Sequence, residues 1–399
     1  MRPLEGVTAV EVGDLVAAQY CGQLLASLGA RVIRIDEPSQ PGRQHQAGFM
    51  PGCLTPEGAI RRLHLAAGKD SATVRYSCAE GTALLKRLLA RADVLIEGLG
   101  GEQAAQLGLG FEELHSLNDD LVVASLSWFG REGPYRDYRA TDLTCSALSG
   151  YVYLNGNPTR PPVNLPVPLG QYMAGLSAAI GICALLLAGP GYDAAKCLDV
   201  SVQESLAVQI AGAATDVVRT GNNARRAGNR MVARNGGRTY TGILPCADGH
   251  AVIALVGEAD YLRLAQLGLN VGELPPGARQ RPGGYPDDVD RLVIPWLASR
   301  TRDQVTAEAQ VVGLHWSGVL SPGEAATTEQ ARARRALRHY KHPLFGPLPF
   351  VAPPIRPPGR PAGDSPAFHL LGADNEAVLT EDLGLSPDEV RALVSNGVI

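Results

Sequence analysis

The stretch that decides the fold is VTAVEV at residues 7–12, followed by AAQYCGQLLASL at 17–28, a glycine at 29 and ARVIRI at 30–35. The first and last pieces are short β-branched runs typical of strands. The middle piece has helical periodicity, and Gly29 stands where a helix C-terminal cap is expected. A strand, a helix and a strand in so short a stretch form a β-α-β unit, in which the two strands must be parallel.

The same alternation continues along the first third of the chain. Strands are predicted at 72–76, 94–96 and 121–126, and helices at 80–90 and 111–117. Strands that alternate regularly with helices indicate an α/β domain with a doubly wound, Rossmann-like sheet.

The rest of the chain gives weaker but readable signals. An apolar helix at 171–188, a strand at 197–202 and a helix at 203–219 are followed by an Arg-, Asn- and Gly-rich stretch at 221–237, a hairpin at 239–245 and 250–256, a tract of nine prolines at 343–366, and a final helix at 386–395. The final helix begins with Ser-Pro-Asp-Glu, a capping sequence with proline at the first helical position.

Composition narrows the class of protein. The chain has 399 residues, 45% of them hydrophobic, and a net charge of −4, which gives no general electrostatic reason for a nucleic-acid or anionic-membrane partner. The longest apolar run, 174–188, is shorter than the roughly 20 residues of a membrane span. The seven cysteines are scattered and the eight histidines show no metal-ligand spacing. We therefore expect a cytoplasmic protein with reduced thiols and no metal site.

Several segments, in order along the whole chain, carry a family resemblance. They are PLEGV at 3–7, LLASLGARVI at 24–33, Lys69 with Ser71, ADVLIE at 92–97, Gly130 with GPY at 133–135, the small-residue helix at 175–187, and the ending GVI at 397–399. Together they resemble the family III CoA-transferases, the group that includes formyl-CoA transferase, carnitine CoA-transferase and α-methylacyl-CoA racemase.

The resemblance implies a domain organisation. A large α/β domain would be formed by both chain ends, residues 1–220 and 335–399, with a smaller domain, residues 221–334, inserted between them. It also implies an interlocked dimer, in which extended linkers let two chains thread through one another. The proline-rich tract at 343–366 suits such a linker, because proline favours an extended backbone.

The residue that the family uses as its nucleophile is missing. The resemblance implies that an aspartate at the start of the apolar helix attacks the acyl-CoA thioester, which requires an ionised carboxylate. Here the motif reads PLGQYMAG at 168–175, so that Gln171 stands at that position and its neutral amide cannot form an exchangeable anhydride. No catalytic residue is therefore predicted at this site. Thr141 stands where the racemase branch has a histidine, which disfavours racemase chemistry, and Asp142 is expected to be a structural hydrogen-bond acceptor.

The basic residues that bind CoA in the family are also sparse. The resemblance leaves Lys69 and Arg139 as candidate contacts to the CoA phosphates, and the backbone at Val16 and Ala17 as a candidate contact to the nucleotide. CoA enters the family's reaction as the thioester substrate, so no separate cofactor is implied.

One hypothesis explains both the missing aspartate and the scarcity of basic residues for CoA. The chain would be the non-nucleophilic subunit of a heteromeric CoA-transferase whose partner is a paralogue with the aspartate intact, as in the two-subunit succinyl-CoA:benzylsuccinate CoA-transferases. The substrates would be an acyl-CoA, such as succinyl-CoA, and a carboxylic acid, such as an arylsuccinate.

Two alternatives remain open. The first is a homodimer with altered acyl-CoA chemistry (a hydrolase, lyase or acyltransferase), in which Gln171 positions an oxyanion. The second is a non-catalytic binding protein on the same scaffold. Tyrosines bracket the expected site and suit either an aryl-bearing acid or the packing of an interface: Tyr135, Tyr138, Tyr151, Tyr153 and Tyr172.

Overall fold

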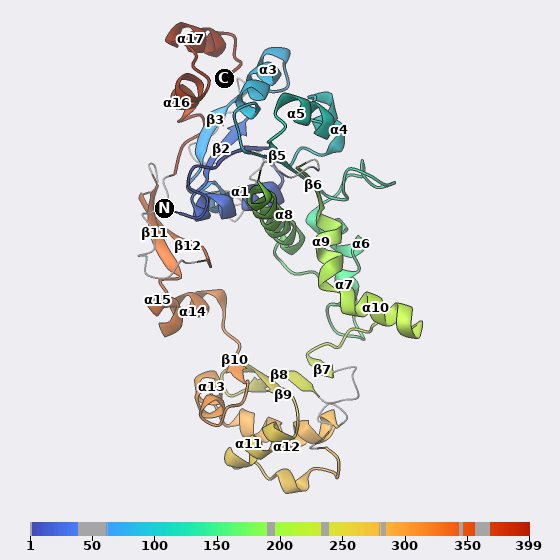
Figure 1. Cartoon of the computed structure of the whole chain (residues 1–399). Coiled ribbons are helices and arrows are strands. Elements are labelled where there is room, and N and C mark those ends of the chain that lie inside the picture. The colour runs from blue at the N-terminus through green and yellow to red at the C-terminus, as the bar shows by residue number, and fades with distance from the viewer. Residues whose placement is uncertain are drawn as a thin grey trace. The chain divides into compact units, whose positions relative to one another are not determined.

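The computed structural model describes residues 2–38, 61, 63–189, 196–232, 239–278, 280, 285–342, 346–355 and 368–399. Within this chain two compact units are distinguished (Figure 1). The first comprises Met1–Tyr151, Leu165–Ala211 and Ala333–Ile399, and the second comprises Val152–Asn164 and Gly212–Arg332.

The first unit is built on a six-stranded sheet in the order β3-β2-β1-β4-β5-β6. Its strands are β1 (Thr8–Val12), β2 (Arg31–Asp36), β3 (Asp70–Thr73), β4 (Val94–Glu97), β5 (Val122–Ser127) and β6 (Cys197–Ser201). All neighbouring pairs are parallel, which confirms the doubly wound α/β prediction. The order reverses between β1 and β4, and at such a switch point the loops at the carboxyl ends diverge and leave room for a ligand.

The strand predicted at 72–76 lies earlier, at Asp70–Thr73. The backbone leaves the sheet beyond Thr73 because the N–H of Arg75 donates to the carbonyl of Val398, near the chain's end, at 2.6 Å. A contact with the opposite end of the chain thus ends a strand whose β-branched pattern would have carried it further.

Helices cover both faces of this sheet. They are α1 (Val16–Leu28), α3 (Ala79–Leu89), α4 (Gly101–Gln106), α5 (Phe111–Leu117), α6 (Asp142–Leu148), α8 (Leu169–Ala188), α9 (Val202–Gln209), α16 (Asn375–Ala377) and α17 (Pro387–Ser395). Successive residues of a strand point to opposite faces of the sheet, so the strands contribute side chains to two separate hydrophobic cores. Val10 and Val12 pack with residues of α3, α5 and α17, whereas Ala9 and Val32 pack with α1 and α8.

The helix predicted at 203–219 is two helices, α9 and α10 (Ala211–Thr220). At Ile210 the backbone leaves helical geometry (φ −107°, ψ 18°), and its N–H donates to Ala207 in a tighter turn. The predicted final helix is confirmed as α17, and Ser386 caps it in a capping box with Glu389.

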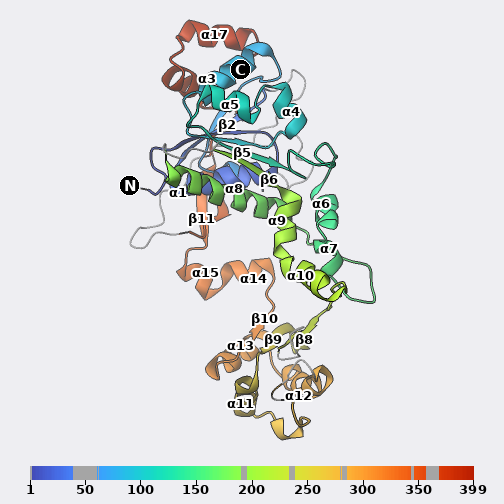
Figure 2. The same cartoon turned by 45° about the vertical axis from the view of Figure 1, so that its right-hand side comes forward.

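Helices α1 and α8 lie side by side against one face of the sheet (Figures 1 and 2). Gly175 makes their approach possible, because a Cβ at this position would lie 2.5 Å from the carbonyl oxygen of Ala17. By length and mean hydropathy (1.7), α8 is the one helix in the described part of the chain that could cross a membrane. Its buried residues, which include Ala174, Ala178 and Ile182, belong to the core of the first unit.

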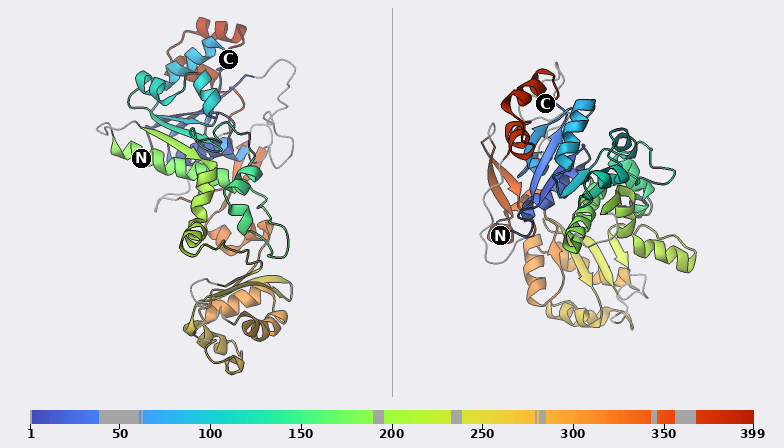
Figure 3. Two further views of the ribbon diagram at one scale, coloured as in Figure 1. Left: turned by 90° about the vertical axis from the view of Figure 1, so that its right-hand side faces the viewer. Right: turned by 45° about the horizontal axis from the view of Figure 1, so that its top comes forward.

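The second unit has its own antiparallel sheet in the order β10-β9-β8-β7. The strands are β7 (Arg230–Val232), β8 (Tyr240–Cys246), β9 (Gly249–Leu255) and β10 (Ser317–Gly318), and the helices include α11 (Glu258–Gln266), α12 (Pro286–Ala298) and α13 (Arg302–Val311). The predicted hairpin is confirmed as the antiparallel pair β8 and β9. The views of Figure 3 show helices packed on one face of this sheet, around a core that contains Trp296 and Trp316.

The C-terminal segment returns to the first unit and closes its sheet at β3. The side chain of Asp374 accepts the N–H of Ser71, and that of Asn375 accepts the N–H of Thr73, each at 2.7 Å. Two side chains therefore satisfy the N–H groups that an edge strand leaves unpaired. Before this contact lies a hairpin of β11 (Leu337–His342) and β12 (Gly346–Val351); the remainder of the proline-rich tract, 343–345 and 356–366, lies outside the described residues.

We expect Gly175→Ala to lower the free energy of unfolding by about 1–3 kcal/mol, because the new methyl group would meet a backbone carbonyl that cannot move away alone. Urea denaturation measures the change. Gly101→Ala in α4 is the matched control, since a Cβ there meets no atom within 4 Å. A Gly175 variant as stable as the control would show that α1 and α8 do not approach as closely as described.

Candidate active site

Three helices of the first unit begin at one place. The first turn of α8 carries Gln171, α1 starts at Val16, and α6 starts at Asp142. Gln171 contacts both of the other two starts, as its hydrogen bond to Val16 and its influence on Asp142 indicate. Because the N-terminus of a helix carries unpaired N–H groups and a partial positive charge, this junction favours negative charge.

Gln171 takes the place of an N-terminal cap for α1. Leu15, the residue before α1, has no side chain that could cap the helix, and the N–H of Val16 donates instead to Oε1 of Gln171 at 3.0 Å. The Gln171 side chain is 7% exposed, so this hydrogen bond is shielded from water. A neutral amide therefore fills a position where the surrounding N–H groups would also stabilise a carboxylate.

Asp142 carries a carboxyl group beside Gln171, the residue that stands at the position of the missing nucleophile. Its partial burial raises its pKa, while the side-chain and backbone amides of Gln171 and the hydroxyl of Ser146 act in the opposite direction. Among the described residues no group forms a hydrogen bond with its buried Oδ1. The positive charge of Arg61 also lowers the pKa of Asp142.

Thr141 has a structural role. Its hydroxyl accepts the N–H of Thr144, and the Thr144 hydroxyl accepts the N–H of Thr141, so that the two residues form a capping box at the start of α6. A threonine hydroxyl does not ionise near neutral pH, so it cannot replace a histidine as a general acid or base. The position that carries a histidine in the racemase branch is thus used here to start a helix.

The switch point of the sheet lies directly before α1. Gly13 has a φ of +98°, and a Cβ on it would lie 2.6 Å from the carbonyl carbon of Gly98, which follows β4. Two loops can pass this closely only because one residue has no side chain. Val16 and Ala17, three and four residues after Gly13, begin α1. The N–H of Val16 donates to Gln171, and Ala17 is fully buried beneath α8.

Lys69 lies in a buried network of ion pairs. It is 2% exposed, its Nζ donates to Oε2 of Glu11 at 2.5 Å and to the carbonyl of Gln19 at 2.7 Å, and burial lowers its pKa. Glu11 is fully buried in β1 and also accepts from Nη1 of Arg34 at 2.9 Å. In this arrangement the ammonium group faces the interior and is not presented to a phosphate.

Arg139 lies in the loop between β5 and α6 and is exposed. The same loop carries an aromatic cluster in which the rings of Tyr135 and Tyr138 stack at 4.6 Å and both contact Phe129 edge-on. Tyr172, beside Gln171, packs edge-on against Tyr20 of α1 at 4.9 Å. Of the four sequence-predicted CoA contacts, Val16 meets Gln171, Ala17 and Lys69 are buried in the fold, and Arg139 is solvent-accessible.

Sequence reasoning missed a second buried ion pair at the same edge of the sheet. Glu97, the last residue of β4, is fully buried and accepts from Nη2 of Arg131 at 2.6 Å. Arg131 also donates to the hydroxyl of Ser125 in β5, and its guanidinium lies over the ring of Phe111. The signal was available, because a glutamate that ends the buried run VLI requires a cationic partner nearby.

The chain belongs to CoA-transferase family III: the model of that family matches residues 4–375. The chain is 29% identical to a succinyl-CoA–D-citramalate CoA-transferase of Chloroflexus aurantiacus, over the whole chain and 98% of the relative. It is 28% identical to the α subunit of the succinyl-CoA–L-malate CoA-transferase of the same genus, over the whole chain and 92% of the relative. Subunit BbsE of the succinyl-CoA:(R)-benzylsuccinate CoA-transferase of Thauera aromatica is 33% identical, over 60% of this chain and 57% of the subunit.

Solved structures agree with this assignment. A CAIB/BAIF family protein from Brucella suis superposes with a TM-score of 0.78 at 25% identity, over 96% of this chain and 99% of that one. A hypothetical protein from Mycobacterium tuberculosis has the same fold, with a TM-score of 0.77 at 22% identity, over 94% and 99% of the two chains.

We expect Lys69→Met to lower the free energy of unfolding by about 2–4 kcal/mol, because Glu11 would stay buried with Arg34 as its one remaining partner in the triad. Denaturant unfolding measures this loss, with the exposed Arg139→Met as a control expected to change stability by less than about 0.5 kcal/mol. A Lys69→Met protein of unchanged stability but weakened CoA binding would instead place Lys69 in the substrate site.

Proposed function

We propose that this chain is the non-nucleophilic subunit of a heteromeric CoA-transferase, which moves CoA between succinyl-CoA and a carboxylic acid of the arylsuccinate class. The observation that carries the proposal is the state of Gln171. It occupies the first turn of α8, where its amide bonds the start of α1, so the position keeps its structural contacts without the charge that nucleophilic attack requires.

The chemistry explains why a partner is needed. Transfer of CoA through the enzyme requires a carboxylate oxygen that attacks the thioester carbon and expels the CoA thiolate, and then a thiolate that attacks the resulting anhydride. An amide oxygen is a poor nucleophile, and its adduct would not return a carboxylate to the protein. The carboxylate in this proposal is the aspartate of a paralogous chain with Gly-Asp at the equivalent helix start.

The kinds of relatives support a two-chain enzyme. The chain resembles an α subunit over its whole length, and a β subunit of the same malate enzyme is 26% identical over the whole chain and 98% of that subunit. The malate enzyme and the enzyme that contains BbsE are both named as succinyl-CoA-dependent CoA-transferases. The second of these enzymes acts on benzylsuccinate, an aryl-substituted acid. The exposed tyrosines of the loop before α6 suit an aryl group.

The surface of α8 also favours a partner chain. Ile180 is 63% exposed and Leu187 is 88% exposed, although they belong to the most apolar helix of the first unit. Two large aliphatic side chains on the outer side of a core helix are better placed beneath another chain than in water. We propose that the paralogue covers them, in the interlocked arrangement that the family resemblance implies.

The decisive experiment expresses the chain alone and together with a family III paralogue from the same genome that has Gly-Asp at the helix start. Native mass spectrometry gives the assembly, and an assay with succinyl-CoA and benzylsuccinate gives the activity of each sample. We expect a mixed assembly whose activity disappears when the paralogue's aspartate is changed to asparagine and survives Gln171→Asn. A stable homodimer of this chain that transfers CoA unaided would overturn the proposal, and Asp142→Asn would then test the remaining carboxyl at the site.

A second prediction concerns the missing charge itself. Gln171→Asp would place a carboxylate in the first turn of α8, facing the start of α1, where helix N-termini favour the ionised form. We expect this variant to form a covalent CoA adduct with succinyl-CoA, detected by mass spectrometry of the intact protein, and to exceed Gln171→Asn at least tenfold in transfer rate. Gln171→Asn has the same side-chain length and no charge, so equal behaviour of the two variants would show that this half of the site has lost more than its nucleophile.

A further inference from the structure

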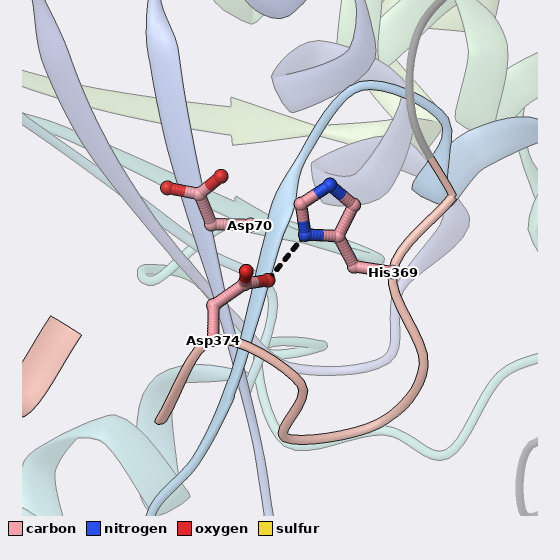
Figure 4. A group of neighbouring side chains, drawn as sticks. All are labelled: Asp70, His369 and Asp374. Atoms are coloured by element: carbon pink, nitrogen blue, oxygen red, sulfur yellow. Dashed lines mark hydrogen bonds and ion pairs between the residues drawn. The ribbon is translucent and has the colours of Figure 1, made fainter. Parts of the chain in front are cut away.

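Three side chains with metal-binding atoms meet at the outer edge of the first unit's sheet, away from Gln171. Asp70 lies at the start of β3, and His369 and Asp374 belong to the C-terminal segment that closes this edge (Figure 4). One ligand atom from each residue lies within 4.8 Å of the others. A metal with bonds of about 2.0–2.2 Å holds tetrahedral ligands roughly 3.4 Å apart, so shifts of about an ångström would complete the site.

Each of the two aspartates uses one carboxylate oxygen in hydrogen bonds, while its other oxygen has no such partner among the described residues. Oδ2 of Asp70 accepts from Nε of Arg31 at 2.7 Å, and Oδ2 of Asp374 accepts from the N–H of Ser71 at 2.7 Å and contacts Nδ1 of His369 at 2.5 Å. No hydrogen bond to either Oδ1 is found within the described part of the chain. Metal-binding carboxylates are typically oriented in this way, by a hydrogen bond on the oxygen that does not ligate.

The local charge balance also favours a cation. Arg31 is shared between Asp70 and Asp382, and Asp374 contacts His369, so that this group of side chains holds three carboxylates and one permanently charged cation. Oδ2 of Asp382 is buried without a hydrogen-bond partner among the described residues. Two nearby arginines, Arg87 and Arg91, donate to the main-chain carbonyls of Leu383 and Asp382 and do not pair with these carboxylates.

We propose that Asp70, His369 and Asp374 bind a divalent transition metal, with Zn²⁺ as the best match, and that water completes a tetrahedral shell. The ligands are Nδ1 of His369 and one oxygen from each aspartate. One imidazole and two carboxylates suit zinc, whereas Mg²⁺ and Ca²⁺ prefer oxygen ligands alone. In a neutral ring that donates to Asp374 the proton is on Nδ1; on binding, the Nδ1 lone pair goes to the metal and the proton moves to Nε2.

The bound metal would cross-link two distant parts of the chain. Asp70 and Asp374 are separated by most of the chain, and the metal would bond the closing segment directly to the edge strand that it covers. Binding to the folded state alone stabilises that state by mass action. This inference is independent of the proposed function, because it concerns neither Gln171 nor a partner chain.

The test uses the full-length chain without a histidine tag, stripped of metal with a chelator. Isothermal titration with ZnCl₂ gives stoichiometry and affinity, and a visible absorption spectrum with Co²⁺ reports a tetrahedral shell. We expect one Zn²⁺ per chain, a higher melting temperature with Zn²⁺, and little effect of Mg²⁺. His369→Gln keeps a side-chain donor toward Asp374 but loses the imidazole nitrogen, and we expect it to weaken zinc binding at least a hundredfold. Asp70→Asn, which keeps an oxygen for Arg31, should weaken it at least tenfold.

His115→Ala is the matched control, because His115 is an exposed histidine on α5 of the same unit. The zinc affinity of the His115→Ala variant should equal that of the unaltered chain. Absence of stoichiometric zinc binding to the unaltered chain would overturn the proposal. Equal zinc affinity in the His369→Gln variant and the unaltered chain would overturn it as well, since the metal would then bind elsewhere.

Discussion

The buried carboxylate of Glu11 constrains the first unit more than any other single group. It lies fully buried in the central strand β1, where an unpaired charge would be prohibitively costly, so two cations must reach it from elsewhere in the chain. Arg34 reaches it from β2 and Lys69 from the residue before β3, and Lys69 also bonds the backbone of α1. The net gain from such a triad is small, but removing one of its members would leave a buried charge without its partner, which is strongly destabilising. The triad therefore joins α1, which begins at the candidate site, to β2 and to the residue before β3.

Glutamine at residue 171 differs from an aspartate by one additional methylene group and by the absence of a negative charge. The amide oxygen of Gln171 caps α1, and the side chain is almost as buried as a core residue. The junction of three helix starts is therefore kept intact by a neutral side chain at residue 171. The carboxyl of Asp142 beside it, whose pKa burial raises, is held there by the capping box of Thr141. The fold of the family is therefore kept although residue 171 carries no carboxylate.

Local patterns in the sequence predicted the parallel sheet, the β8–β9 hairpin and the capping of α17, because each depends on residues close together in the chain. Features that depend on distant partners were not predictable. The motif containing Lys69 gives no sign that its ammonium points inward, since its partner Glu11 lies 58 residues away. Gly212 follows the break at Ile210, but an isolated glycine is tolerated within a helix and does not by itself predict a break. Strand β3 ends early because the chain's last residues bond to Arg75. The sequence predicts that the buried Glu97 needs a cationic partner, but it does not show that this partner is Arg131.

The closing of β3 by Asp374 and Asn375 has a consequence for how the protein is made. The N–H groups of Ser71 and Thr73 leave the ribosome early, but the side chains that satisfy them are translated 303 and 302 residues later. At about 5–20 residues per second, the edge of the nascent sheet waits for roughly 15–60 seconds with its hydrogen-bonding groups open to other chains. Contacts of such long range also slow folding. Until Asp374 and Asn375 are made, this edge strand can pair with other chains, and a chaperone that shields it during synthesis would protect the nascent chain from aggregation.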